Sequence, residues 1–232
     1  PCLEPGPPTM EKDSTLATIL YQIGMNAEQY KLLTKRYPFY YVHEAVRSSR
    51  DKKGGKTRID AHELRQQDGR TESRYSAGRV VARRYGRSFF QIPGLMDFAD
   101  PDFMLNHCFH VRGTEIVGDE VLIRVDVVAA ERIKTPDVNG SIYLDPGSFQ
   151  VTRTVLRLSK VTRDIDYLTD FEIVTLFREI MPSISIIGSV SSTQTIDPKS
   201  RMQIDTAWET LKLVGYQFVK DKPGDEVRKP QP

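Results

Sequence analysis

The stretch Asn139-Gly140-Ser141-Ile142-Tyr143-Leu144-Asp145-Pro146-Gly147-Ser148-Phe149 combines a short strand, a tight turn and the start of a longer strand. Ile142 and Leu144 alternate with other residues before the turn, and Asp-Pro-Gly-Ser supplies residues that favour turns. The stretch lies inside Gly118–Gln194, where similar alternating segments follow one another up to a corner at Met181-Pro182. Strands that follow one another through tight turns pair antiparallel, so this region predicts an antiparallel sheet.

The spacing of these segments narrows the fold class. In Val121–Val127 the apolar residues share one face, opposite Arg124 and Asp126. The repeat from turn to turn is roughly 15 to 20 residues, against about 8 to 12 in an immunoglobulin-type sandwich. Long strands in meander order predict an α+β, mostly β fold: a strongly curved antiparallel sheet, an unclosed barrel, with a few helices on its concave side.

The region before the sheet carries the helix signals. We expect a helix over Ala27–Arg36 with Asn26 as its N-cap, ended by Pro38. A short helix should begin after Asp100, with Pro101 at its first position, and run to about His107. Further strands are predicted at Phe39–Ser48, Thr57–Leu64 and Tyr75–Arg84.

Length and composition place the chain among globular proteins. It has 232 residues, 39% hydrophobic and 28% charged, enough for a sizeable core. We expect a linker over residues 1–14, a single half-barrel domain over 15–221 and a polar tail over 222–232. No apolar run reaches the length that spans a bilayer. The first residue is Pro1, so we expect a processed or excised piece.

Charge is unevenly distributed, although the net charge is only +2. The segment Arg47–Arg87 holds thirteen Lys and Arg residues against five Asp and Glu. We interpret it as the solvated outer face of a sheet, with peripheral contact to an anionic membrane as the next interpretation. Aromatic residues that would stack bases do not accompany the arginines, so nucleic acid is not an expected partner.

The two cysteines, Cys2 and Cys108, leave two alternatives open. One is a stray terminal thiol and a buried small residue. The other is a disulfide that fixes the N-terminal arm to the body, which requires an oxidising compartment.

Several of these segments together resemble a known fold. Cys108–Glu115, Val121–Val127, the Asn139–Asp145 hairpin leading into Val151–Leu158, and Phe177–Pro182 resemble the C-terminal portion of the outer-membrane lipoprotein-carrier fold. The resemblance implies a bent sheet with helices over its concave side, a location in the bacterial periplasm or cell envelope, and a lipid or acyl-chain ligand. Cys2-Leu3-Glu4-Pro5 resembles the last strand of a carboxypeptidase-regulatory-like domain.

An apolar stretch with little charge supplies the candidate binding residues. They are expected either as ordinary core or as a lid over the concave face that contacts acyl chains. The candidates are Phe89, Phe90, Ile92, Leu95, Met96, Phe98, Phe103, Met104 and Leu105.

Catalytic patterns are weak. His107 and His110 suit a metal-dependent hydrolase only if one helix carries both, and the Phe109-His110-Val111 context favours a strand. The serines between Ser183 and Ser192 lack a nucleophile elbow, and we expect them on the solvent face of an edge strand. The leading hypothesis is a non-catalytic envelope module that binds a lipid or other apolar ligand and needs no cofactor. The alternative is a structural or interaction domain with a filled barrel that docks to another envelope protein.

Overall fold

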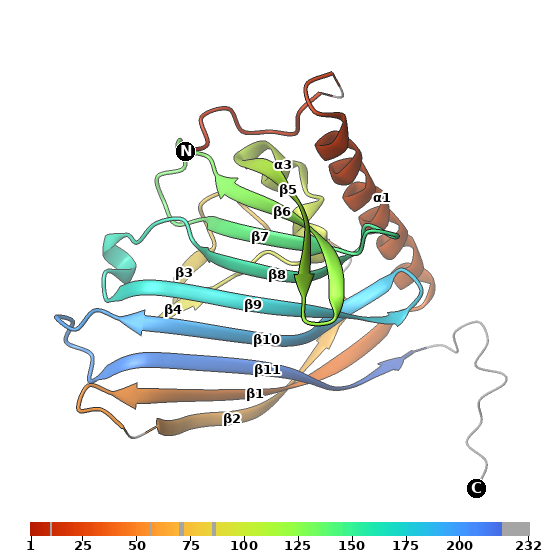
Figure 1. Cartoon of the computed structure of the whole chain (residues 1–232). Helices are drawn as coiled ribbons and strands as arrows, with labels where there is room; N and C mark the ends of the chain where they lie inside the picture. The colour runs from red at the N-terminus through yellow and green to blue at the C-terminus, as the bar shows by residue number, and fades with distance from the viewer. Residues whose placement is uncertain (10, 56, 70–71, 85–86, 220–232) are drawn as a thin grey trace, which may run out of the picture.

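A nine-stranded antiparallel sheet forms the body of the computed structural model, which describes residues 1–9, 11–55, 57–69, 72–84 and 87–219 (Figure 1). Its strands occur in the order β2-β1-β11-β10-β9-β8-β7-β6-β5, and β3 and β4 pair as a separate hairpin. The strands are β1 (Phe39–Asp51), β2 (Thr57–Asp68), β3 (Val81–Arg84), β4 (Arg87–Phe90), β5 (His107–Val117), β6 (Glu120–Ala129), β7 (Val138–Leu144), β8 (Val151–Leu158), β9 (Leu168–Met181), β10 (Ile184–Ile196) and β11 (Ile204–Phe218). The helices are α1 (Ser14–Arg36), α2 (Leu95–Phe98), α3 (Pro101–Asn106) and the 3-10 turn η1 (Arg163–Ile165).

The sheet is strongly curved and its edges, β2 and β5, do not meet. Seven of its strands are 10 to 15 residues long. Register shifts at Val111/Gly113, Val42/His43 and Ile187/Ser189 bend individual strands, because an extra residue on one strand increases the local twist. The predicted fold class, an unclosed antiparallel barrel with helices on its concave side, is confirmed.

Helix α1 is longer than the sequence predicted. It begins after Asp13, whose side chain accepts a hydrogen bond from the Leu16 backbone at 2.9 Å, and it ends at Arg36. Asn26 is therefore not a cap. It lies within the helix and donates to the Ser148 carbonyl at 3.0 Å, which ties the helix to the β7–β8 turn. The buried stripe of α1 consists of Leu16, Ile19, Leu20, Ile23, Ala27, Tyr30 and Thr34.

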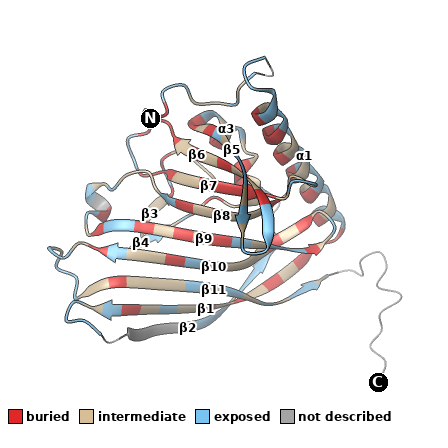
Figure 2. Cartoon of the chain, viewed as in Figure 1, coloured by how far each residue is buried: buried red, intermediate tan, exposed pale blue. Residues whose placement is uncertain are grey.

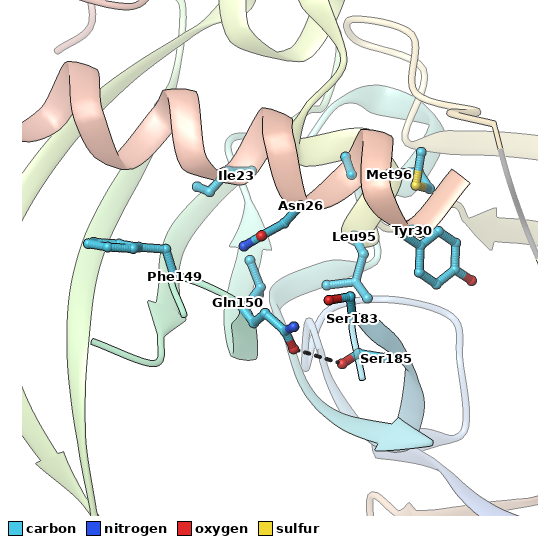
Figure 3. Close-up of a pocket in the computed structure, with 11 residues that line it drawn as sticks. Ile23, Asn26, Tyr30, Leu95, Met96, Phe149, Gln150, Ser183 and Ser185 are labelled. Atoms are coloured by element: carbon cyan, nitrogen blue, oxygen red, sulfur yellow. Dashed lines mark hydrogen bonds between the residues drawn. The ribbon is translucent and has the colours of Figure 1, made fainter. Parts of the chain in front are cut away.

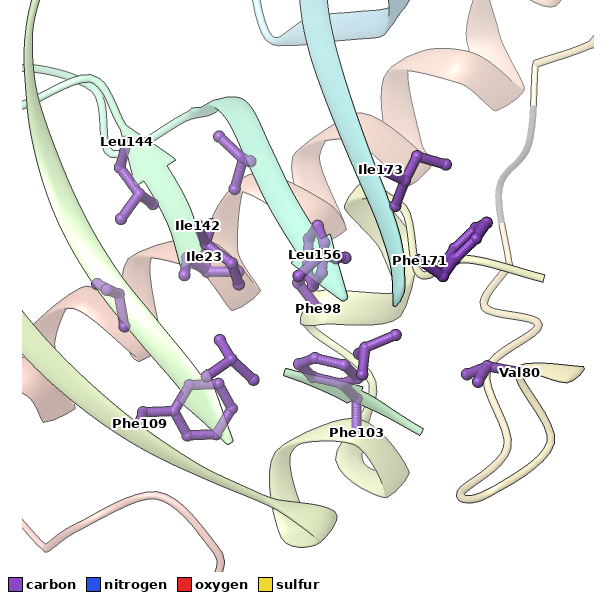
Figure 4. Packing of buried hydrophobic residues seen from close by; sticks show 14 of the residues in the cluster. Ile23, Val80, Phe98, Phe103, Phe109, Ile142, Leu144, Leu156, Phe171 and Ile173 are labelled. Carbon is purple, nitrogen blue, oxygen red and sulfur yellow. The ribbon is translucent and has the colours of Figure 1, made fainter. Parts of the chain in front are cut away.

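The concave side over β5–β8 is a filled core. Inward-facing apolar side chains of these strands pack against α1, Phe98 of α2 and Phe103 of α3 (Figure 4). Phe103 lies edge-on to Phe98, with ring centroids 5.4 Å apart. Buried residues occur on β6–β10 and on β1, whereas β11 has a single buried residue, Thr206 (Figure 2). The sheet thus has a half packed beneath helices and a more open half around β11.

The N-terminal arm is fixed to the body by a disulfide between Cys2 and Cys108, which settles the alternative left open by the sequence. The Cys2 carbonyl accepts from Glu131 and the Gly6 amide donates to the His107 carbonyl. The residues that resemble a regulatory-domain strand, Cys2–Pro5, lie in irregular structure and form no strand.

Three local predictions are corrected or fall outside the described residues. Only Val81–Arg84 of the expected strand Tyr75–Arg84 is a strand. The serines of β10 are not on an edge strand, because β10 lies between β9 and β11. The tail 222–232 lies outside the described residues. Among the described helices, none combines the length and hydropathy of a membrane span.

Candidate functional site

Two adjoining cavities of about 580 and 600 Å³ lie on the open half of the concave face. They share Gly94, Phe177 and Ile187 as lining residues, so they form one elongated space, here called the concave groove. Volumes of this size are usual for small-molecule sites. The groove runs across β9, β10, β11 and β1 and lies beneath the β3–β4 hairpin, which Figure 1 shows behind the sheet.

One wall of the concave groove is apolar. Phe171, Ile173 and Phe177 occupy alternate positions of β9 and therefore point to the same side. Val190 of β10 pairs with Thr175 on one side and with Leu211 of β11 on the other, which extends this wall across three strands.

The β4 strand and the segment after it form the roof. Phe90 stacks on Phe171 with ring centroids 4.3 Å apart, which anchors the hairpin to the sheet. Phe89 is about half exposed, and Ile92 and Pro93 complete the apolar cover. The roof therefore rests on the apolar wall through aromatic contact.

The opposite wall carries three charged residues, Arg47, Arg65 and Glu209. Glu63 pairs with both arginines, and the four residues are here called the Arg–Glu quartet. Arg47 Nε donates to Glu209 Oε2 at 2.5 Å, and Arg65 Nη1 donates to Glu209 Oε1 at 3.0 Å. Arg65 Nε donates to Glu63 Oε1 at 2.7 Å. Burial alone would lower the pKa of Arg65, but the two glutamates outweigh it and raise that pKa.

His43 lies next to the quartet, opposite Arg65 in the β1–β2 register. It is buried, and its Nε2 donates to the Ile187 carbonyl at 2.8 Å. Loss of solvation lowers the pKa of His43, and the nearby Arg65 charge lowers it further, against the Ile187 hydrogen bond. The neutral His43 ring therefore donates the hydrogen bond that the Ile187 carbonyl needs. This carbonyl lies at the bulge between Ile187 and Ser189, and the pairing of β10 with β11 begins at Ser189.

The end of the groove near α1 adjoins a small hollow of about 40 Å³ (Figure 3). Ser185 lies between the groove and this space and donates to Gln150 Oε1 at 3.4 Å. Phe149 and Ser183, which border it, are the two described non-glycine residues with positive φ, 55° and 64°. Phe149 lies in the connection between β7 and β8 and Ser183 in the connection between β9 and β10, and for residues with a side chain this backbone conformation costs free energy.

The predicted candidate residues fall into different places. Phe89, Phe90 and Ile92 line the roof, and Leu95 and Met96 border the groove near α1. The remaining four lie elsewhere: Phe98 and Phe103 are 1% and 0% exposed core residues, Met104 borders a separate hollow beside α1, and Leu105 is 56% exposed.

The histidines predicted as weak metal candidates lie apart from the groove. His107 is fully buried; its Nδ1 donates to the Phe103 carbonyl at 2.9 Å and its Nε2 lies 3.4 Å from Asp137 Oδ1. Asp137 Oδ2 also accepts from Tyr75 and Gly78, each at 2.7 Å. Burial would raise the pKa of Asp137, but the neighbouring His107 and the hydrogen bonds from Tyr75 and Gly78 hold it below its usual value. His110 is exposed, and the described residues contain no cluster of three metal-binding side chains.

Sequence reasoning missed the quartet and misplaced two of its members. Arg47 and Arg65 belong to the basic segment that we interpreted as a solvated outer face, yet they face the concave side and pair with glutamates. The available signal was period two: Tyr41, His43, Ala45 and Arg47 occupy alternate positions and so share a face.

Comparison with known proteins gives a distant structural likeness. No protein-family model matches the sequence, and no curated protein matches it significantly. Among solved structures, the chain is similar to a putative outer membrane lipoprotein-sorting protein domain from Vibrio parahaemolyticus, at 9% identity and a TM-score of 0.41, covering 86% of this chain and 97% of that one. It is also similar to a LolA superfamily protein from Nitrosomonas europaea, at 10% identity and a TM-score of 0.42, covering 90% and 97%. What the groove binds is therefore inferred from its own residues.

Proposed function

We propose that this chain is a non-catalytic module of the bacterial envelope that holds the acyl chain of a lipid, or another apolar ligand, in the concave groove. The observation that carries the proposal is the cavity of about 580 Å³ between the sheet and the β3–β4 hairpin, which has an apolar wall and an apolar roof. The adjoining cavity of about 600 Å³ extends this space past polar residues that include Gln67, Asp68 and Glu72. Burying apolar ligand surface there is favourable by about 25 cal/mol per Å². A long, narrow ligand suits two adjoining cavities better than a compact one.

The disulfide supports an envelope location. The bond between Cys2 and Cys108 joins the first residues to the start of β5, and such bonds persist in oxidising compartments. The bacterial periplasm is one of these compartments, and it is also where a lipid-holding module would meet its ligand.

A matched pair of substitutions tests the proposal. Ser192 lines the groove, whereas its neighbour Ser191 is exposed on the other face of β10. Ser192→Phe places a ring in the groove and should weaken binding of dansyl-undecanoic acid by about tenfold or more, equivalent to about 1.4 kcal/mol. Ser191→Phe adds the same ring outside and should leave binding unchanged. Fluorescence titration measures both, and thermal unfolding confirms that each variant is folded.

Lipid extraction and native mass spectrometry of the purified protein complete this test. A bound lipid in the wild type and its loss in Ser192→Phe support the proposal. A wild type that carries no lipid and fails to bind the probe contradicts it, as do equal effects of the two substitutions.

A second candidate function is a structural or interaction domain, and the exposed side of α1 favours it. Tyr21, Met25 and Leu32 project apolar side chains into solvent from one side of this helix. Exposed apolar side chains gathered on one element often mark a protein interface. If this candidate is right, Tyr21→Ser should abolish binding to an envelope partner captured by crosslinking, while the probe titration stays negative.

A further inference from the structure

The two long walls of the concave groove differ in chemistry, and this difference specifies the ligand more closely. The following inference rests on the function proposed above. Phe171, Ile173 and Val190 line one side, and Arg47, Arg65 and Glu209 of the Arg–Glu quartet line the other. A purely hydrocarbon ligand would displace water from the charged groups of the quartet without giving them a new polar partner. This loss of hydration costs free energy.

Arg65 has an unused donor on this wall. Its Nε and Nη1 atoms bind Glu63 and Glu209, but Nη2 has no acceptor among the described residues although that atom is shielded from solvent. A shielded donor without a partner is destabilising, and more so on a charged group. The Arg65 side chain as a whole lines the groove and is 26% exposed, so a turn of its guanidinium would bring Nη2 to an acceptor on a ligand there and remove this cost.

The charge balance of the quartet indicates what kind of acceptor is favoured. Two arginines and two glutamates give it a formal charge of zero, so it exerts little long-range attraction or repulsion on a ligand. Selectivity then depends on the local bond. Hydrogen bonds from a guanidinium to an anionic oxygen are roughly twice as strong as those between neutral groups.

We propose that the concave groove binds an anionic amphiphile, with its carboxylate or phosphate oxygen accepting from Arg65 Nη2 and its acyl chain lying on the apolar wall. The headgroup sits against β1, β2 and β11, and the chain passes beneath Phe89 and Phe90 toward Phe177. A carboxylate and a phosphate both offer the required group, an anionic oxygen with a free lone pair.

Two probes that differ only at the headgroup test this proposal. Wild-type protein should bind dansyl-undecanoic acid roughly tenfold or more tightly than its methyl ester, because the ester keeps the chain but loses the anionic oxygen. Arg65→Met should remove this preference and leave ester binding within about twofold. Glu209→Gln gives the quartet a charge of +1 and should tighten acid binding by roughly threefold.

Arg157→Met is the matched control. Arg157 of β8 also forms a strand-to-strand pair with a glutamate, Glu172, at 2.6 Å, but on the other face of the sheet and away from the groove. This variant should bind both probes as the wild type does. Competition by dodecanoate and by dodecyl phosphate then ranks the two headgroups.

The outcomes separate the two proposals. If the wild type binds acid and ester equally, or if Arg65→Met and Arg157→Met behave alike, the headgroup assignment is wrong while a lipid-holding groove stands. If neither probe binds the wild type at all, the lipid-holding function fails and the headgroup assignment fails with it. Circular dichroism and thermal unfolding of each variant exclude misfolding as the cause.

Discussion

Removing the bond between Cys2 and Cys108 should destabilise the protein far more than the size of the N-terminal arm implies. The two residues are 106 positions apart, so the bond closes a loop that includes α1, β1 to β4 and the short helices. The chain-entropy relation gives about 4.7 kcal/mol for a loop of that length, arising mainly from restriction of the unfolded chain. This is a large part of the roughly 5 to 15 kcal/mol that stabilises a typical domain.

Urea unfolding followed by circular dichroism measures this cost. With a slope of about 2 kcal/mol per M, the midpoint should fall by roughly 2 M when reductant is added. The Cys2→Ala/Cys108→Ala double variant should unfold at the midpoint of the reduced wild type, and reductant should not change it further. Unreduced wild type in denaturant should show no reactive thiol. A reduced protein whose midpoint shifts by less than about 0.5 M would refute the loop-entropy reasoning, because the closed loop is too long for so small an effect.

Two further predictions concern the backbone and acid stability. Gly140→Ala should destabilise the protein by about 3 kcal/mol or more in the same assay, because a Cβ there would lie 2.0 Å from the Val155 carbonyl oxygen. Gly24→Ala in α1 should instead stabilise the protein by up to about 1 kcal/mol, because a Cβ there meets nothing within 4 Å. Asp137→Asn should destabilise by about 3 kcal/mol at pH 7, since it removes a buried carboxylate that accepts from Tyr75 and Gly78. The folded pKa of Asp137 is lowered, so its contribution is present above the unfolded pKa of about 3.9 and is lost as the pH falls through the lower folded value. The gap between variant and wild type should therefore be constant above about pH 5 and narrow in acid; a gap that widens below pH 4 would contradict this assignment.

The sheet was predictable from the sequence because each of its strands carries its own local signal. Period-two alternation and turn residues indicate a strand that begins near Phe149, and the structure places β8 at Val151–Leu158. Helix α1 was predicted only over its second half, since Thr15, Thr18 and Gly24 have low helix propensity. Burial of its apolar stripe against the sheet outweighs that propensity, as is usual for helices in proteins.

The polar wall of the groove was not predictable in the same way. Its members come from β1, β2 and β11, and Arg47 meets Glu209 only because β1 pairs with a strand more than 150 residues later in the chain. A single sequence shows which residues share a face of one strand, but it does not show which distant strand pairs with it. The candidate residues of the roof could be predicted because they lie close together in the sequence. Phe98 and Phe103, within the same stretch, belong instead to the core.

The quartet also explains why the groove exists at all. Over β5–β8 the inward positions hold apolar residues such as Val125, Ile142 and Leu156, and helices pack directly on them. Over β1, β2 and β11 the inward positions include charged groups, and covering these with an apolar helix face would remove their water at a cost that no contact offsets. Helices α1 and α2 reach the Phe39–Tyr41 end of β1 through Tyr30 and Met96, whereas at the apolar boundary the β3–β4 hairpin lies on β9, with Phe90 stacked on Phe171. An apolar wall facing a charged wall, with no described element between them, is an environment that an anionic amphiphile satisfies and that neither water nor a hydrocarbon satisfies alone.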